Sequence, residues 1–410
     1  MSSKQELSLV KCAVKLPINS LASTAAGDVL LCGGGGAGRS GVKNRLRVAR
    51  IDAATGQLST VAETVLSSNE DAPWNLAPHP DKDTRVVAVG INGSADDIAS
   101  GDANNCRIFD YSSIASATEQ KAEEEQAKSK ADAFSLVKKK TTLTSKRATD
   151  YQSVCRFSTN GKHLLIGGTD GTAVLLAYPS LENGPELVSG RRSKTGKVLD
   201  ASFDAESKLL ALASAAAIDV HSVSDGAVSH SIAADAAGAG EPCDFRAIGF
   251  SPAALAKSPE LVSTLYVVMN AKSKKRAYLA AFDSATWKLA KRATAVSKHP
   301  VLTFAISFDG TLLALATSAA EVMIVCARTL RVLARFPDAH EVAITGLAFS
   351  PDGKFLVTGS IDENCNVIAL PNSLDAYPGN RGLASPGTLI LILLAIIMVI
   401  LAVYYRDLAL

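Results

Sequence analysis

The chain of 410 residues is 47% hydrophobic but only 5% aromatic, a composition that excludes a disordered chain and suits short strands with small side chains. Lys plus Arg number 42 against 40 Asp plus Glu, so no broad positive field favours nucleic acid and we expect no nucleic-acid function. The seven cysteines are widely spaced in apolar runs and the six histidines are scattered, which predicts reduced, buried thiols and no zinc site. The polar N-terminus lacks the apolar core of a secretory signal, so we expect the bulk of the chain in the cytosol.

The most unusual segment is the glycine-rich run at residues 30–52, LLCGGGGAGRSGVKNRLRVARID. Residues 36–41 satisfy the G-x-G-x-x-G pattern, and residues 33–40 approach a P-loop in which Arg39 replaces the required lysine. Both motifs need a helix after the loop, but the residues that follow alternate as in a strand, which disfavours nucleotide binding. The simplest interpretation is a hairpin loop between the third and fourth strands of the first repeat unit. A loop this rich in glycine can also turn its carbonyls inward, as rings of carbonyls do around a monovalent cation.

A second irregular segment, residues 112–146, is charged and rich in alanine. A helix in its middle is one interpretation. We favour a solvated insertion between repeat units, because runs of charge usually face water.

One pattern recurs between residues 150 and 370, in which an apolar-aromatic pair, a turn and two apolar runs follow one another. The copies share a phenylalanine at blade-like spacing, namely Phe157, Phe203, Phe250, Phe308 and Phe349. Tight hairpin turns are predicted at Asn160-Gly161, Asp170-Gly171, Asp309-Gly310 and Asp352-Gly353. Two less regular units, at residues 14–52 and 86–111, bring the expected total to seven blades. We therefore predict an all-β, seven-bladed WD-type β-propeller over residues 1–371, divergent because it lacks the Trp-Asp dipeptide, and closed by the N-terminal strand joining the last blade.

The C-terminal region changes character after the repeats. Residues 372–386 are rich in Pro, Gly and Ser and predict a linker. Residues 388–405, TLILILLAIIMVILAVYY, carry no charge and reach about 27 Å as a helix, close to the hydrocarbon thickness of a bilayer. A buried globular helix is the alternative, but such runs are usually shorter and amphipathic. We predict one transmembrane helix at residues 387–405 and a lumenal tail at residues 406–410, inserted after translation, with the propeller facing the cytosol.

The glycine-rich run resembles the potassium-binding loop of the Sec-twelve family, the endoplasmic reticulum exchange factors that activate the Sar-type GTPase of the COPII coat. The likeness extends to the acidic segment EDAP at residues 70–73, to AHEVAITGLAFSPDG from Ala339 and to the membrane span. By this resemblance Asn44 matches the functional asparagine of the family. A potassium ion would be held mainly by backbone carbonyls of the loop, with ligands at Gly35, Gly36, Ala37, Gly38, Gly41 and Asn44.

The resemblance also implies which residues meet the GTPase. Val42 and Lys43 would contact it, with Lys43 standing where the family often shows proline. Asp71 and Pro73 match an acidic segment that borders the GTPase site, although an ordinary solvated carboxylate is the alternative for Asp71.

The implied activity is guanine nucleotide exchange without covalent chemistry, at the endoplasmic reticulum membrane, as the start of COPII vesicle formation in transport to the Golgi. Exchange requires tighter binding to the nucleotide-free GTPase than to its GDP-bound state. The alternative is an exchange-inactive, tail-anchored propeller that acts as a scaffold for export of specific membrane cargo. A propeller hydrolase has little support, because no Ser, His and Asp constellation stands out.

Overall fold

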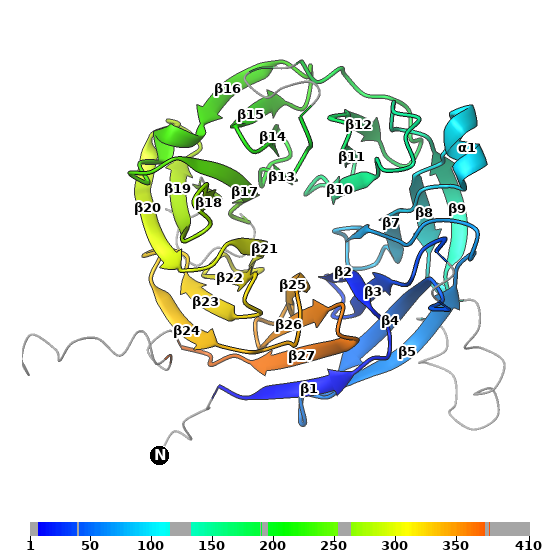
Figure 1. Ribbon diagram of the computed structural model, residues 1–410, viewed down its shortest axis with the longest axis horizontal. Coiled ribbons are helices and arrows are strands. Elements are labelled where there is room, and N and C mark those ends of the chain that lie inside the picture. The colour runs from blue at the N-terminus through cyan, green and yellow to red at the C-terminus, as the bar shows by residue number, and fades with distance from the viewer. Residues whose placement is uncertain are drawn as a thin grey trace, which may run out of the picture.

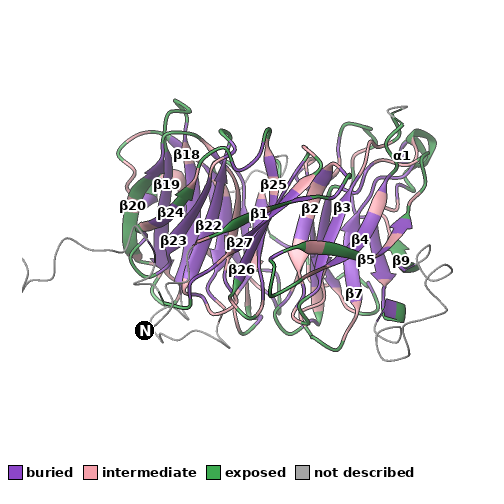
Figure 2. Ribbon diagram, turned by 90° about the horizontal axis from the view of Figure 1, so that it is seen from below, coloured by how far each residue is buried: buried purple, intermediate pink, exposed green. Residues whose placement is uncertain are grey.

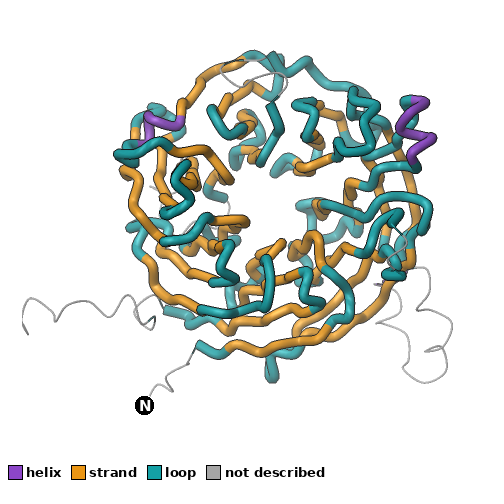
Figure 3. Tube along the Cα trace, in the orientation of Figure 1, coloured by secondary structure: helices purple, strands orange, loops and turns teal. Residues whose placement is uncertain are grey.

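The computed structural model describes residues 7–38, 41–114, 133–188, 190, 196–252, 264–373 and 377. These residues form seven antiparallel sheets around a central axis, each sheet being one blade (Figure 1). The predicted all-β, seven-bladed propeller is confirmed. Most of the described residues form strands and loops, and two short helices, α1 (Ala95–Ser100) and η1 (Ala234–Ala237), lie in the connections (Figure 3).

The first three blades contain, from the innermost strand outward, the following strands. Blade 1 contains β2 (Ile18–Ser23), β3 (Val29–Gly33), β4 (Arg45–Ile51) and β5 (Leu58–Val65). Blade 2 contains β6 (Asn75–Pro78), β7 (Val86–Gly90), β8 (Cys106–Asp110) and β9 (Ser135–Lys140). Blade 3 contains β10 (Gln152–Phe157), β11 (His163–Gly168) and β12 (Ala173–Ala177).

The remaining blades follow in chain order. Blade 4 contains β13 (Asp200–Phe203), β14 (Leu209–Ala213), β15 (Ala217–Ser222) and β16 (Val228–Ala233). Blade 5 contains β17 (Cys243–Phe250), β18 (Thr264–Ala271), β19 (Ala277–Asp283) and β20 (Leu289–Ser297). Blade 6 contains β21 (Val301–Ile306), β22 (Leu312–Thr317), β23 (Val322–Cys326) and β24 (Val332–Phe336). Blade 7 contains β25 (Ile344–Phe349), β26 (Phe355–Ser360), β27 (Asn364–Ala369) and β1 (Leu9–Ala13).

The ring closes between the two ends of the described chain. Strand β1 pairs antiparallel with β27, with Leu9 opposite Ile368 and Cys12 opposite Cys365. The N-terminal strand is thus the outermost strand of the last blade, as predicted. This closure joins the first and last blades and leaves no long open edge between them.

The connections between strands define two faces of the ring, because neighbouring strands in a blade run in opposite directions. We call the turn face the one that carries the turns from each innermost strand to the second strand. We call the loop face the opposite one, which carries the segments leading into each innermost strand and the connections between second and third strands. The loop face therefore contains residues 34–44 and helix α1, which lies at the top of Figure 2.

The predicted turns have the expected backbone. Gly161, Gly171, Gly310 and Gly353 have φ values of 70°, 88°, 69° and 71°, which glycine adopts readily. In blade 6 the Ser307 Oγ donates to Asp309 Oδ1 at 2.7 Å and accepts from the backbone N of Leu312 at 2.9 Å.

The alignment of phenylalanines needs one correction, in blade 6. Strand β21 ends at Ile306, two residues before Phe308, whereas β25 ends at Phe349. Because Ser307 and Ser350 begin equivalent turns, Ile306 is the structural equivalent of Phe349, and Phe308 lies inside the turn.

Burial follows the position of a strand within its blade (Figure 2). All six residues of β22 are buried, whereas five of the six residues of β9 are exposed. Strand β9 lies within the predicted insertion at residues 112–146, so the C-terminal part of that segment is the outermost strand of blade 2. An outermost strand faces water, which explains why the sequence SLVKKK looked like part of a solvated insertion.

The seven cysteines are buried and unpaired, as predicted. Among the described residues, no three His, Cys, Asp or Glu side chains lie close enough to hold a metal ion.

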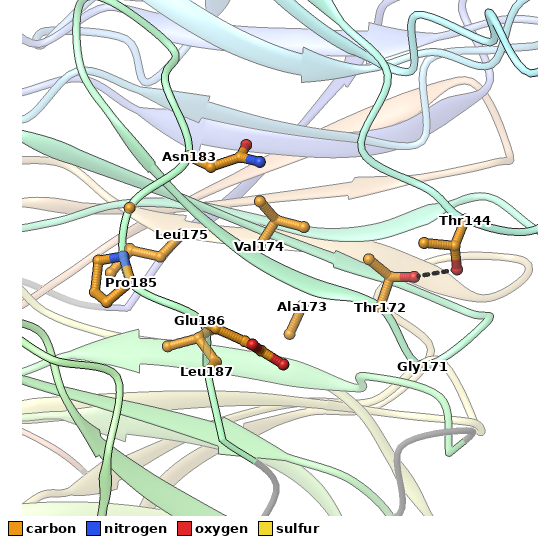
Figure 4. Close-up of a pocket in the computed structure, with 11 residues that line it drawn as sticks. Thr144, Gly171, Thr172, Ala173, Val174, Leu175, Asn183, Pro185, Glu186 and Leu187 are labelled. Atoms are coloured by element: carbon orange, nitrogen blue, oxygen red, sulfur yellow. Dashed lines mark hydrogen bonds between the residues drawn. The ribbon is translucent and has the colours of Figure 1, made fainter.

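Blade 3 has three strands among the described residues, and the chain beyond β12 turns back along its edge. The backbone N of Gly184 donates to the carbonyl of Leu175 at 2.8 Å. A cavity of about 430 Å³ lies beside this edge (Figure 4), and the hydroxyls of Thr144 and Thr172 are 3.0 Å apart in its wall.

The chain leaves the last blade on the turn face. Tyr377 is fully buried in a cluster with Leu356, Ile368 and Leu370. The predicted transmembrane helix at residues 387–405, the tail and most of the predicted linker lie outside the described residues. Within the part of the chain that is described, no helix is both long and apolar enough to cross a bilayer.

Candidate functional site

The glycine-rich loop, residues 34–44, connects β3 to β4 on the loop face. We predicted a loop between the third and fourth strands of the first blade, but it joins the second and third. The position of the loop within the blade shifts by one strand because the first strand of the chain, β1, belongs to blade 7 and not to blade 1. The loop is followed by strand β4 rather than by a helix, so the context that phosphate-binding glycine motifs require is missing.

Asn44 holds the base of the loop from inside. The side chain is 1% exposed, and its Oδ1 accepts a hydrogen bond from the backbone N of Gly36 at 2.9 Å. Its Nδ2 lies 3.2, 3.2 and 3.3 Å from the carbonyl oxygens of Ser67, Glu70 and Asp71. One buried amide therefore ties the glycine-rich loop to the acidic segment.

Glycine is required at the start of the loop by this close approach. A Cβ on Gly34 would lie 2.4 Å from Asn44 Oδ1 and 2.5 Å from Asn44 Cα, and the φ of Gly34 is 144°. A Cβ on Gly33 would lie 1.8 Å from the carbonyl oxygen of Pro17. The loop therefore packs against its own base more closely than any side chain would allow.

The strands that flank the loop are held by an ion-pair network. Arg45 and Arg47 both contact the carboxylate of Glu63 on β5, with Arg47 Nη2 at 2.9 Å. Burial raises the pKa of Glu63, but hydrogen bonds from the two guanidinium groups outweigh it and lower the pKa overall. The network keeps β4 and β5 in register below the loop.

The acidic segment at residues 70–73 makes contacts within the site. The two carboxylate oxygens of Glu70 each accept a hydrogen bond from Arg107 at 2.7 Å. Asp71 Oδ1 accepts from the backbone N of Ala72, and Asp71 Oδ2 accepts from Nε1 of Trp74, both at 2.8 Å. Asp71 is therefore engaged in ordering its own segment, unlike a free solvated carboxylate.

The predicted site residues divide into a buried base and an exposed tip. Asn44 and Pro73 are buried, and the carbonyl of Pro73 accepts from Asn19 Nδ2 at 3.0 Å. The tip consists of residues whose side chains or backbone face water, namely Ala37, Gly38, Gly41, Val42 and Lys43. The structure brings the predicted loop and the predicted acidic segment together, and the tip is what a partner would meet.

Trp74 is the part of the site that the sequence prediction missed. Its side chain is 39% exposed, and its ring stacks on Tyr151 with centroids 4.9 Å apart. Tryptophan is enriched at protein interfaces relative to the rest of the surface. The available signal was that Trp74, one of only two tryptophans in the chain, directly follows the acidic segment.

The loop offers the type of oxygen ligand that a monovalent cation prefers. Backbone carbonyls and the amide of Asn44 are neutral oxygen ligands of the type that replaces the hydration shell of potassium. Gly36 and Gly41 have φ values of 69° and 77°. A positive φ reverses the course of the backbone locally, so the carbonyls of the loop do not all point the same way. Residues 39 and 40 lie outside the described residues.

Comparisons with known proteins agree with the fold and with the family resemblance. The family model described as "WD domain, G-beta repeat" matches residues 328–368. The chain is 24% identical over 344 residues to SEC12-like protein 2 of Arabidopsis thaliana, which covers 84% of this chain and 76% of that protein. It is 22% identical over 370 residues to the guanine nucleotide-exchange factor SEC12 of Candida glabrata, which covers 88% of this chain and 71% of that protein. The resemblance to the Sec-twelve family that the glycine-rich loop predicts is therefore confirmed, at modest identity over most of the chain.

Proposed function

We propose that this protein is a guanine nucleotide exchange factor that activates a Sar-type small GTPase at the endoplasmic reticulum membrane, where it starts COPII vesicle formation. The observation that carries the proposal is the amide of Asn44, which holds the glycine-rich loop against the acidic segment. The similarity to a protein named as a guanine nucleotide-exchange factor supports the same activity.

In the proposed mechanism the tip of the loop presses on the switch and phosphate-binding region of the GTPase. Val42, which is 37% exposed, supplies an apolar contact and Lys43 a cationic one. Asn44 remains behind them and keeps the tip in one conformation. A preordered loop loses little conformational entropy on binding, so more of the contact energy discriminates the nucleotide-free state from the GDP-bound state.

Asp71 and Trp74 form the second contact of the proposed surface. The carboxylate of Asp71 holds the indole N–H of Trp74 at 2.8 Å, which fixes the direction of the exposed ring. Asp71 also places a negative charge beside the loop, where it would disfavour nucleotide phosphate. Pro73 is buried and supports the segment from beneath.

We further propose that a potassium ion stabilises the tip, with ligands among Gly35, Gly36, Ala37, Gly38, Gly41 and Asn44. The ion would supply a positive charge that gathers backbone carbonyls which otherwise repel one another. Asn44 would then support the base of the loop through its hydrogen bonds, and the cation would support the tip mainly through backbone carbonyls.

The predicted anchor makes activation local to a membrane. The chain passes Tyr377 on the turn face before the predicted span, and the glycine-rich loop lies on the opposite face. We propose that the loop face points into the cytosol, where the GTPase reaches it from the side away from the bilayer.

The test is release of fluorescent GDP from a purified Sar-type GTPase by the full chain in liposomes, in potassium and in sodium. We expect acceleration in potassium, a smaller effect in sodium, and loss of acceleration in Asn44→Ala. Lys43→Ala should reduce the rate, whereas the matched control Lys82→Ala removes an exposed cation from the turn face and should not.

Each outcome separates the alternatives. If the wild-type chain gives no acceleration over intrinsic release, exchange is refuted and the scaffold for membrane cargo becomes the better explanation. Acceleration that depends on Asn44 but not on the cation refutes only the potassium ion. Acceleration that depends on neither places the exchange site elsewhere.

A further inference from the structure

The central channel opens on the loop face into a cavity of about 370 Å³. All seven blades contribute to its wall, because it is lined by residues of each innermost strand or of the segment just before it. Trp74, which follows the acidic segment, is one of these residues. The cavity therefore lies beside the glycine-rich loop but is separate from it.

The wall of this cavity has an excess of positive charge. It contains three cations, Arg156, Lys197 and Arg246, and one carboxylate, Asp200.

The carboxylate of Asp200 is already engaged. Its Oδ1 accepts from Arg156 Nη2 at 3.0 Å, and its Oδ2 accepts from the backbone N of Ile248 at 3.0 Å. Asp200 thus pairs with Arg156, and among the described residues neither Lys197 nor Arg246 forms an ion pair with a carboxylate.

Arg246 is the less solvated of these two cations. Its side chain extends from β17, is half-buried, and among the described residues forms no hydrogen bond or ion pair. Burial lowers the pKa of its guanidinium, while the nearby Asp200 and Tyr151 oppose that change. A guanidinium carries five N–H donors. Burying part of it costs free energy when no hydrogen-bond acceptor is nearby, and a bound anion would supply such an acceptor.

Two aromatic rings, Trp74 and Tyr151, also line the cavity. Trp74 stacks on Tyr151 at a centroid distance of 4.9 Å and an interplanar angle of 30°. Lys197 Nζ lies 5.3 Å from the centroid of Tyr151 and donates to its hydroxyl at 3.3 Å. Cationic and aromatic side chains thus line the same cavity.

We propose that the mouth of the channel binds the phosphate group of a small molecule, with Arg246 and Lys197 as its cationic partners. A phosphate carries a charge of about −1.5 to −2 near neutral pH, which matches two unpaired cations better than a carboxylate does. The planar fork of Arg246 presents donors that suit phosphate oxygens, and the Trp74 and Tyr151 rings offer a surface for a planar group attached to the phosphate. The site shares Trp74 with the proposed exchange surface, but its cationic partners Arg246 and Lys197 lie outside that surface, so phosphate binding can be measured without the GTPase.

The test uses the full chain with Trp287→Phe, which leaves Trp74 as the single tryptophan. Inorganic phosphate and phenyl phosphate are titrated at constant ionic strength, and binding is followed by Trp74 emission and by calorimetry. We expect a saturable change with both probes. Tighter binding of phenyl phosphate identifies a ring-bearing phosphomonoester as the ligand, and equal binding identifies inorganic phosphate.

Variants assign the binding to these residues. Arg246→Met should weaken binding between about tenfold and about a hundredfold, because charge-assisted hydrogen bonds are lost. Arg246→Lys should recover part of this loss. Lys197→Met should also weaken binding, and since Lys197 is exposed, folding is not at stake. The matched control Lys208→Met removes an exposed cation from the turn face and should leave binding unchanged.

Two results would overturn the proposal. The first is the absence of any saturable signal with either probe up to about 1 mM, which is already weak binding. The second is equal affinity in wild type, Lys197→Met and Arg246→Met. Thermal unfolding of each variant shows whether a loss of binding reflects a loss of fold.

Discussion

Replacement of Asn44 gives the sharpest test of how the glycine-rich loop is held. The buried amide makes one bond as an acceptor, from Gly36, and its two N–H hydrogens are shared among three carbonyl oxygens at 3.2 to 3.3 Å. Asn44→Ala therefore removes about three hydrogen bonds at about 1 kcal/mol each, or about 2–4 kcal/mol when the orphaned groups are included. The loss falls on the loop, so local opening should increase by about thirtyfold to several hundredfold.

Asn44→Asp separates hydrogen bonding from cation binding. If Asn44 acts mainly as a cation ligand, a carboxylate in its place should preserve or strengthen the loop. If it acts through the contacts described above, Asp faces the carbonyls of Ser67, Glu70 and Asp71 with an acceptor instead of a donor. We expect Asn44→Asp to be at least as damaging as Asn44→Ala.

The assay is hydrogen exchange at the Gly36 amide, beside nucleotide release. Lys43→Ala is the matched control, because it alters the exposed tip and leaves the buried amide in place. Wild-type protection of Gly36 in Asn44→Asp would refute the reasoning.

Three further predictions concern stability. Gly34→Ala places a Cβ 2.4 Å from the side-chain oxygen of the asparagine at the loop base and should lower the free energy of unfolding by at least about 2 kcal/mol. Gly41→Ala has open space around the new Cβ and should lower it by about 1 kcal/mol. Equal losses of the two variants in urea unfolding would contradict this. Glu70→Gln leaves the 9% exposed side chain of Arg107 without its carboxylate and should cost about 1–3 kcal/mol, part of which Arg107→Met should restore in a double-mutant cycle. Burial lowers the pKa of His340 from its usual 6.5, so the unfolded chain binds a proton at a pH where the folded chain does not, and stability should fall as pH drops below 6.5. The decline in Tm with falling pH should be shallower in His340→Gln. An unchanged slope would argue against His340 as the source of the decline.

Much of the fold could be predicted because its signals are local. Strand periodicity and the Asx-Gly turns lie within a few residues of each other, so Gly161 and Gly353 could be recognised without knowledge of the ring. Phe308 misled the alignment because an aromatic residue in a turn looks like one at the end of a strand. Strand β9 was missed because an outermost strand is exposed and need not alternate.

The candidate site was predicted in part, through a resemblance. The glycine-rich loop and the acidic segment could be named from the sequence, but nothing in it indicated that Asn44 joins them, because Asn44 and Asp71 are 27 residues apart. Trp74 and Tyr151 come from different blades, and their stacking depends on how neighbouring blades pack.

The sequence by itself thus determined the blades, the turns and the identity of the glycine-rich loop, since each is specified by short-range backbone preference and hydrophobic pattern. Only the tertiary structure decided which residues meet across blades. Closure of the ring brings the seven innermost strands around one channel, and this places Arg246 near Asp200 and Tyr151, although none of the described residues forms an ion pair or hydrogen bond with its guanidinium. Such contacts depend on the relative position of distant strands, which no local pattern encodes.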